Sequence, residues 1–175
     1  MTRNGNGIAT STDDIATAPF TVVVDTREQV PFTFLDLRTD AKDGRKPLVV
    51  PTVRGTLTSG DYSIHGFESQ VSIERKGLDD LFNTLGQGRE RFERELIRLA
   101  SSNVVADVVI EADWGAIVAA PPQHSRLDPK TIFRSVIAWR LRFPNIHWWC
   151  CPGRRFAEIL TYRLLERFWK DLNRP

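Results

Sequence analysis

One acidic and two basic residues interrupt an apolar, strand-like stretch near the middle of the chain. The stretch VSIERKGLDD spans residues 71–80 and contains Glu74, Arg75 and Lys76 in succession. Side chains two apart on a strand share a face, so Glu74 and Lys76 should lie together and Arg75 opposite. A carboxylate can ligate a divalent cation, while a neighbouring ammonium group neutralises charge on a phosphate or orients the attacking water. Taken alone, this pair also fits an incidental ion pair on a surface strand.

Two further acids stand at the borders of expected strands. Asp25 ends the β-branched run FTVVVD, and Asp61 follows Gly60 in GDY. Singly, each has an ordinary interpretation, Asp61 as a turn residue and Asp25 as an acid leaving the sheet. Magnesium takes one or two protein carboxylates and keeps several waters, so acids delivered from strand ends to one point suit it. With Glu74 and Lys76, the two acids therefore predict a magnesium-dependent phosphate site.

The surrounding pattern alternates strands with helices. Periodicity and turn residues predict strands at 20–25, 48–53, 60–66, 69–76, 103–113 and 145–151, the third and fourth forming a hairpin. Helical spacing predicts helices at 77–85, 89–102, 128–143 and 153–172. Residues 30–59 read as an irregular, mobile excursion around the short strand at 48–53. The order of elements predicts an α/β domain with a central sheet.

Two helices carry more detailed expectations. In the helix at 89–102, Arg89 with Glu93 and Arg91 with Glu95 are spaced to pair one turn apart. In the closing helix, the apolar residues expected to face inward are Phe156, Leu160, Leu164 and Phe168.

Length and composition bound the protein class. A chain of 175 residues with 41% hydrophobic content suits one domain, which we place at 20–172 after a flexible tail at 1–19. No apolar run suits a membrane span or secretion, so we expect a soluble cytoplasmic protein without membrane contact. The two cysteines, Cys150 and Cys151, are adjacent, which suits neither a disulfide framework nor a paired zinc site.

Basic residues are concentrated in the last third of the chain. Residues 126–175 contain eleven Lys and Arg against four acids, a charge of +7, whereas the first 125 residues carry −5. This asymmetry indicates a polyanionic partner. Arg163, Arg167 and Lys170 share one face of the closing helix and could contact DNA, or form a solvated face or a dimer rim. Arg89, at a helix start, could touch a DNA phosphate.

The motifs together resemble the nuclease domain of the XPF-type structure-specific endonucleases. The resemblance rests on VVVDTRE, GDY, IERK with Asp80 four residues beyond Lys76, and GRERFERELIRL, and it covers most of 21–172. It implies a restriction-endonuclease-like fold, a central mixed β-sheet flanked by helices, and Mg²⁺- or Mn²⁺-dependent cleavage of branched, flap or fork DNA.

The resemblance also assigns roles to individual residues. It implies that Asp61 and Glu74 ligate the metal, that Asp25 is a further acid at the metal, and that Lys76 is the catalytic lysine. Arg27, Arg75 and Asp80 match positions that support the site, and we expect Arg75 to point away from it and to be held by Asp80.

Some expectations separate this chain from the larger family members. It has no room for a helix-hairpin-helix module or a helicase portion, so we expect a stand-alone nuclease domain of the kind bacteria and phages carry. Because the family pairs nuclease-type domains, we expect a homodimer. Its candidate interface on the last two helices comprises Trp139, Phe143, Leu165 and Trp169. The alternatives are a non-catalytic DNA-binding or scaffolding module of the same fold, and a nuclease for RNA or non-specific substrates.

Overall fold

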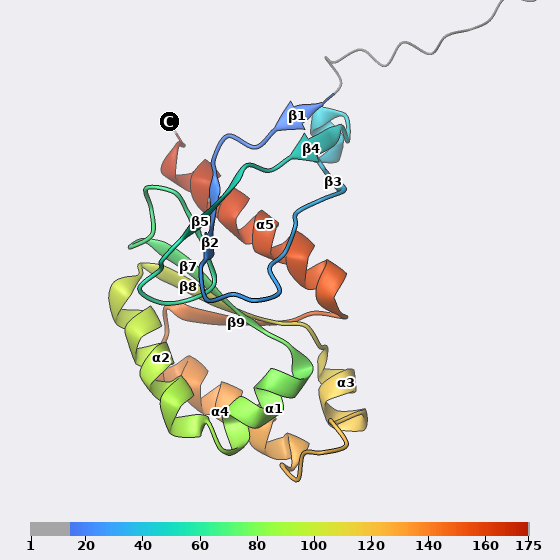
Figure 1. Cartoon of the computed structure of the whole chain (residues 1–175), viewed down its shortest axis with the longest axis vertical. Coiled ribbons are helices and arrows are strands. Elements are labelled where there is room, and N and C mark those ends of the chain that lie inside the picture. The colour runs from blue at the N-terminus through green and yellow to red at the C-terminus, as the bar shows by residue number, and fades with distance from the viewer. Residues whose placement is uncertain (1–14, 175) are drawn as a thin grey trace, which may run out of the picture.

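A six-stranded mixed sheet forms the centre of the molecule (Figure 1). The computed structural model describes residues 15–174. The strand order is β5-β2-β6-β7-β8-β9. The strands are β2 (Val22–Asp25), β5 (Thr52–Gly55), β6 (Tyr62–Ile64), β7 (Val71–Lys76), β8 (Val105–Ile110) and β9 (Ile146–Cys150). β6 runs antiparallel to β2 and β7, whereas β7, β8 and β9 are parallel to one another. The α/β class, the mixed sheet and the predicted hairpin are confirmed.

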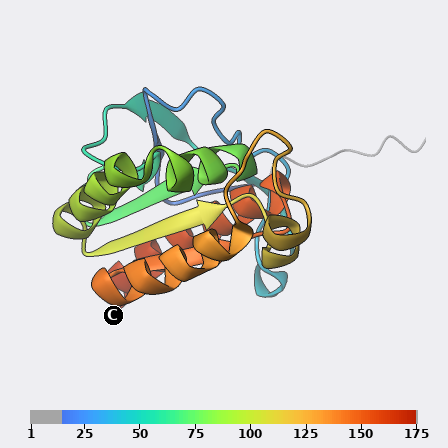
Figure 2. The ribbon, with the colours of Figure 1, turned by 90° about the horizontal axis from the view of Figure 1, so that it is seen from below.

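Helices cover both faces of the sheet (Figure 1). On one face lie α1 (Leu78–Gly86), α2 (Arg89–Ser102) and α4 (Pro129–Arg142), and Figure 2 shows β8 between α2 and α4. The long α5 (Arg154–Leu172) crosses the other face, and the short α3 (Trp114–Ala119) follows β8. Alternation along β8 divides its residues between the two cores: Val109 packs in the α5 cluster, and Val108 and Ile110 pack in the α1/α2/α4 cluster.

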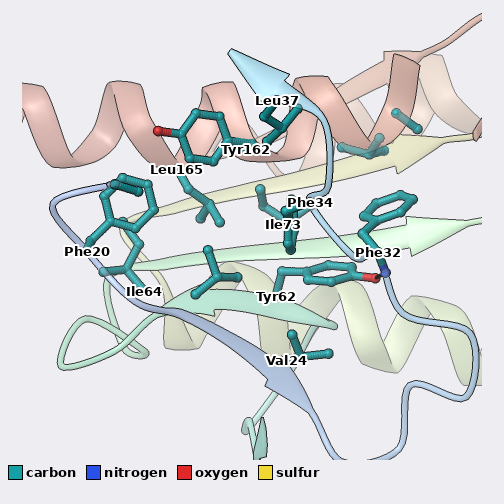
Figure 3. Close-up of a cluster of buried hydrophobic side chains, with 14 of the residues drawn as sticks. Phe20, Val24, Phe32, Phe34, Leu37, Tyr62, Ile64, Ile73, Tyr162 and Leu165 are labelled. Atoms are coloured by element: carbon teal, nitrogen blue, oxygen red, sulfur yellow. Dashed lines mark hydrogen bonds between the residues drawn. The ribbon is translucent and has the colours of Figure 1, made fainter. Parts of the chain in front are cut away.

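Aromatic side chains dominate the core beneath α5 (Figure 3). Tyr62 of β6 stacks on Phe32 with ring centroids 5.1 Å apart, and its hydroxyl accepts a hydrogen bond from the Phe32 amide. Phe20 stacks on Tyr162 of α5 at 5.8 Å. This core therefore ties α5 to the sheet and to the segment after Glu28.

The segment between β2 and β5, residues 26–51 and hereafter called the flap, contains regular structure, whereas an irregular excursion with one short strand was predicted. Within it, β3 (Leu37–Arg38) and β4 (Pro47–Val49) join β1 (Ala16–Thr17) in a second, three-stranded sheet, and a 3-10 helix spans Ala41–Asp43. The predicted single strand at 48–53 is divided between β4 and β5, which belong to different sheets. Phe32 and Phe34 are buried, and this burial stabilises the segment.

Polar contacts from α5 hold the flap from the other side. Glu158 accepts hydrogen bonds from the backbone amides of Thr33 and Phe34, and Arg155 donates to the carbonyls of Leu35 and Asp36. Phe34 and Asp36 have positive φ values of 55° and 57°, which are uncommon for residues with a side chain. The contacts from α5 hold these two residues in that conformation.

Several boundary predictions change. Residues 1–14 of the predicted tail lie outside the described part of the chain, but Ala16–Thr17 form β1 and Ala18 is buried, so the ordered region begins before residue 20. On α5, Phe156 is 50% exposed, and the buried positions are Ala157, Glu158, Thr161, Tyr162 and Leu165. Leu160, Leu164 and Phe168 are partly buried against the core, as expected. Within residues 15–174, no helix combines the length and apolarity needed to cross a bilayer.

Candidate active site

A polar cavity of about 600 Å³ opens at one edge of the central sheet. Because β6 runs antiparallel to its neighbours, its start lies at the same edge as the ends of β2 and β7. Seven predicted residues lie in the wall: Asp25, Arg27, Asp61, Glu74, Arg75, Lys76 and Asp80. The rest of the wall comprises Glu28, Gln29, Val30, Gly60, Arg91 and Glu95. The topology therefore brings together acids and bases that are up to about 70 residues apart in the sequence.

Glu74 and Lys76 share a face of β7 and form an ion pair. The Lys76 Nζ lies 2.7 Å from Glu74 Oε1 and 3.1 Å from Asp80 Oδ2 in the first turn of α1. It also lies 4.9 Å from the centre of the Phe92 ring of α2. Glu74 and Lys76 are both buried. Two carboxylates and an aromatic ring thus hold the lysine at the cavity.

Asp61 is placed by the glycine that precedes it. Gly60 has a φ of 77°, and a Cβ there would lie 2.1 Å from Ser72 Oγ and 3.1 Å from the Ile73 carbonyl oxygen. The Asp61 amide donates to the Ile73 carbonyl, and Asp61 Oδ2 accepts from the Arg75 amide at 2.7 Å. The carboxylate is thereby anchored to β7 beside Glu74.

Gly60→Ala should destabilise the protein more than Gly66→Ala, which changes a glycine of similar φ. Gly66 has a φ of 84°, and a Cβ added there would meet no atom within 4 Å, so Gly66→Ala should cost about 1–2 kcal/mol of unfolding free energy from backbone strain alone. Gly60→Ala adds the clash and the loss of the buried Ser72–Ser59 hydrogen bond, at least about 1 kcal/mol more. Urea denaturation of both variants measures the difference, and equal losses would contradict the packing argument.

Burial raises the pKa values of the two acids beside Lys76. It raises the pKa of Asp61 to about 6. It also raises the pKa of Glu74 to about 8, with a further contribution from the negative charge of Asp61. Ionisation of these two carboxylates is therefore unfavourable unless a nearby cation compensates their negative charge.

Asp25 is engaged differently from Asp61 and Glu74. Its Oδ1 accepts from the Arg27 amide and Nε, and its Oδ2 accepts from Arg27 Nη2 and the Leu57 amide. Burial alone would raise its pKa, but the hydrogen bonds from Arg27 and Leu57 lower it below the usual value. Asp25 therefore holds Arg27 and the Leu57 turn.

The donor set fits one divalent cation on two carboxylates. The cavity wall carries six acids and four bases, a formal charge of −2, and its acids offer the hard oxygen ligands that Mg²⁺ and Mn²⁺ prefer. Within residues 15–174, no group of three or more Asp, Glu, His or Cys side chains is arranged to hold a metal. The role of Asp25 as a further acid at the metal stays a prediction, and both of its carboxylate oxygens accept hydrogen bonds from Arg27 and Leu57.

Arg75 points to the opposite face of β7, as predicted, but its partners are different. Its Nε and Nη2 donate to the two oxygens of Glu28 at 2.9 and 3.0 Å, and Nη1 donates to Glu111 Oε1 at 3.0 Å. Asp80, the expected partner, contacts Lys76 instead. Glu111 also accepts from Arg154 of α5. This ion-pair network, Glu28–Arg75–Glu111–Arg154, runs from the cavity wall, which includes Glu28 and Arg75, to α5.

Sequence reasoning assigned no role to Glu28, Glu111 or Arg154. The alternation of side chains along β7 could have indicated acidic partners. It directs Arg75 toward the α5 core, and a buried arginine requires acids around it. Glu28 stands within VVVDTRE, and Glu111 directly follows β8.

The predicted charge pairs within α2 do not form. Arg89 donates to Ser135 of α4 at 2.6 Å and stacks over Trp139 at 4.7 Å, away from the cavity wall, while Glu93 pairs with Arg142 of α4. Arg91 and Glu95 line the cavity without an ion pair between them. The spacing of one helical turn indicated that the two members of each pair share a face of α2. It did not indicate which neighbouring element that face contacts.

The predicted basic face of α5 is neutralised by neighbouring acids. Arg163 lies 2.7 Å from Glu166 and 3.3 Å from Asp40 of the flap. Arg167 pairs with Asp171 at 2.8 Å, and Lys170 pairs with Glu166 at 3.0 Å. DNA binding by Arg163, Arg167 and Lys170 stays a prediction. These residues contact acids of α5 and the flap and lie outside the cavity wall.

The comparisons with known proteins agree with this geometry. The ERCC4 domain family model matches residues 24–162, more than half of the chain. XPF from Aeropyrum pernix superposes with a TM-score of 0.62 at 19% identity, over 85% of this chain and 61% of that one. The same protein in complex with DNA superposes with a TM-score of 0.62 at 20% identity, over 89% of this chain and 68% of that one. No curated protein matches significantly.

The two kinds of match agree on one architecture. The structural matches share the restriction-endonuclease-like fold, and the family match includes β6, β7 and the end of β2, which border the cavity. The chain therefore belongs to the ERCC4 domain family.

Proposed function

We propose that this protein is a metal-dependent DNA endonuclease that hydrolyses phosphodiester bonds in branched, flap or fork DNA. The observation that carries the proposal is the convergence of Asp61, Glu74 and Lys76 in one polar cavity with a formal charge of −2. Membership of the ERCC4 domain family supports it, as does the likeness to an XPF protein whose structure includes DNA.

Asp61 and Glu74 are the residues that would hold Mg²⁺ or Mn²⁺. When bound, such an ion supplies a Lewis acid and lowers the pKa of a coordinated water. Burial alone would lower the pKa of Lys76, but the charges of Glu74 and Asp80 raise it, so the ammonium group stays charged at neutral pH. This supports charge neutralisation at the phosphate over proton abstraction as the role of Lys76.

A substrate panel tests this function directly. Labelled flap, fork, Holliday-junction, linear duplex and single-stranded DNA, with an RNA of the same sequence, are incubated with the purified protein plus Mg²⁺, Mn²⁺ or EDTA. We expect metal-dependent cuts near the branch point of flap or fork DNA. Cleavage in EDTA, or equal cutting of every substrate including RNA, would contradict the proposal.

We also propose a homodimer, with an interface different from the one predicted. Trp139, Phe143 and Leu165 are buried in the core, and Trp169 packs against Phe20, so these four residues are occupied within the domain. The exposed apolar side chains of α4 are instead Phe133, Ile137 and Leu141, which are 49%, 47% and 75% exposed. They recur every four residues and so form a stripe along the helix.

This α4 stripe lies beside the free edge of the sheet. Ser135 and Arg142 contact α2, and helical geometry places Phe133 and Ile137 on the side of α4 away from α2. The adjoining β9 is the edge strand of the central sheet. A second copy covering the stripe would remove this apolar surface from water.

Introducing charge into the α4 stripe should separate the dimer. The double substitution Ile137→Glu with Leu141→Glu should weaken self-association at least about 30-fold, because losing a central apolar anchor typically costs about 2 kcal/mol. Light scattering across a concentration series measures the change, with Ile97→Glu on α2 as the exposed-helix control. A wild-type protein that stayed at 19.9 kDa throughout the series would remove the claim.

A further inference from the structure

The four basic residues of the cavity wall differ in what they contact. Arg27 is held by Asp25, Arg75 by Glu28 and Glu111, and Lys76 by Glu74 and Asp80. The side chain of Arg91 has no ion pair or hydrogen bond to any residue in the described range 15–174. It is therefore the one cavity base in that range whose charge is not engaged by a protein acid.

The backbone of Arg91 is nevertheless firmly placed. It occupies the first turn of α2, between Arg89, which is held by Ser135 and Trp139, and Phe92, which is buried against Trp139 and Trp148. Its own side chain is exposed at the cavity rim. An anchored helix thus presents an exposed arginine side chain without a polar partner to the cavity.

We propose that Arg91 binds a backbone phosphate of the DNA strand that enters the cavity, an inference that rests on the proposed nuclease function. A wall with a formal charge of −2 repels a phosphate, and one divalent cation only neutralises that wall. A further positive charge is needed to attract the strand. The planar guanidinium group supplies it and can donate two parallel hydrogen bonds to phosphate oxygens.

The other wall bases are poorly suited to this role. Recruiting Arg75 or Lys76 entirely to a phosphate would leave a buried carboxylate, Glu28 or Glu74, without its partner, which is unfavourable. Arg91 leaves no such group behind. In this arrangement Arg91 of α2 attracts the DNA, while the ion pairs that shape the cavity stay intact.

Arg94 provides a matched control on the same helix. Its side chain is exposed, like that of Arg91, and forms no ion pair or hydrogen bond within the described residues. Arg94 nevertheless lies outside the cavity wall. Substituting either arginine removes one positive charge from the surface of α2. Only the substitution at Arg91 removes a charge from the cavity.

The test compares Arg91→Ala, Arg91→Lys and Arg94→Ala in the full chain. On flap DNA with Mg²⁺, kcat/KM of Arg91→Ala should fall about 10- to 100-fold, the range expected for one hydrogen-bonded charge, and mainly through a higher KM. Arg91→Lys should recover part of the loss, because it keeps the charge without the planar fork. Arg94→Ala should stay within about twofold of wild type, and melting temperatures should be unchanged for all three.

Binding of the same DNA in EDTA gives a second measurement that does not depend on cleavage. The plot of log affinity against log salt should flatten by about 0.9 for a duplex phosphate contact, or about 0.7 for a single strand, in Arg91→Ala but not in Arg94→Ala. Equal salt slopes for the two variants, or a loss confined to kcat, would overturn the proposal. If wild type binds this DNA but does not cleave it, the nuclease function fails and the salt slopes still decide the role of Arg91. If wild type does not bind it, both fail.

Discussion

Asp61→Asn and Glu74→Gln should each lower the cleavage rate at least about 100-fold while leaving the protein folded, since a catalytic metal contributes several kcal/mol. Each substitution replaces an anionic oxygen with an amide of nearly the same size. The amide weakens capture of Mg²⁺, which relies on hard, charged oxygen ligands. The loss of rate should therefore arise at the metal.

The stability of the metal-free variants separates this cause from misfolding. Burial raises the pKa values of Asp61 and Glu74 to about 6 and about 8, above the values of unfolded chains. A group of this kind stabilises the fold fully below its unfolded pKa, and that contribution is lost as pH rises through the folded value. At pH 8 the neutral amides should therefore melt at the same temperature as the metal-free wild type, or higher.

Thermal shift with added Mg²⁺ provides a readout besides cleavage. Wild-type protein should be stabilised in proportion to the logarithm of Mg²⁺ concentration, and the two variants should not respond. Asp80→Asn is the matched control, since Asp80 contacts Lys76 rather than belonging to the proposed pair of ligands. Full cleavage by both folded variants would refute the assignment of Asp61 and Glu74.

Arg75→Ala should be among the most destabilising single substitutions in this chain, at about 3–5 kcal/mol of unfolding free energy. Removing the guanidinium group leaves Glu28 buried without its bidentate partner and takes one of two arginines from Glu111. Cleavage should be lost as well, because Glu28 borders the cavity and also accepts from the Val30 amide.

Urea denaturation measures this effect against a surface ion pair. Arg167→Ala breaks the exposed Arg167–Asp171 pair of α5 and should cost no more than about 0.5 kcal/mol. Arg75→Lys should fall between the two, because it keeps the charge but cannot contact both acids in the same way. A loss below about 1 kcal/mol in Arg75→Ala would show that the ion-pair network contributes little to stability.

The sequence predicted which residues meet in the cavity better than it predicted their contacts. Glu74 and Lys76 lie in β7, where the period of two places them on one face, and Asp61 immediately precedes β6. The partners of Arg75 depend on which strand ends meet, and Glu28, Glu111 and Arg154 come from three separate elements. Periodicity within one element contains no information about such contacts.

The predicted dimer interface was wrong, and the acidic partners of α5 were missed, for a related reason. Trp139 and Leu165 looked like surplus apolar residues because the sequence does not reveal that two cores, one on each sheet face, require them. The basic face of α5 was likewise inferred from the spacing of residues within that helix alone. Arg163 and Lys170 meet Asp40, which lies in the flap more than 120 residues earlier in the chain.

The central position of β7 restricts how its length can vary. It pairs with β6 on one side and β8 on the other, and alternate residues serve opposite purposes: Glu74 and Lys76 face the cavity side with α2, and Arg75 faces the α5 side. Inserting one residue within 71–73 would exchange the two sets, directing Glu74 and Lys76 into the aromatic core and Arg75 toward the cavity side with α2. The turn at 65–70 can absorb added length, because it precedes the paired segment and is largely exposed. Insertions and deletions should therefore be tolerated before Val71 and excluded from there to Lys76.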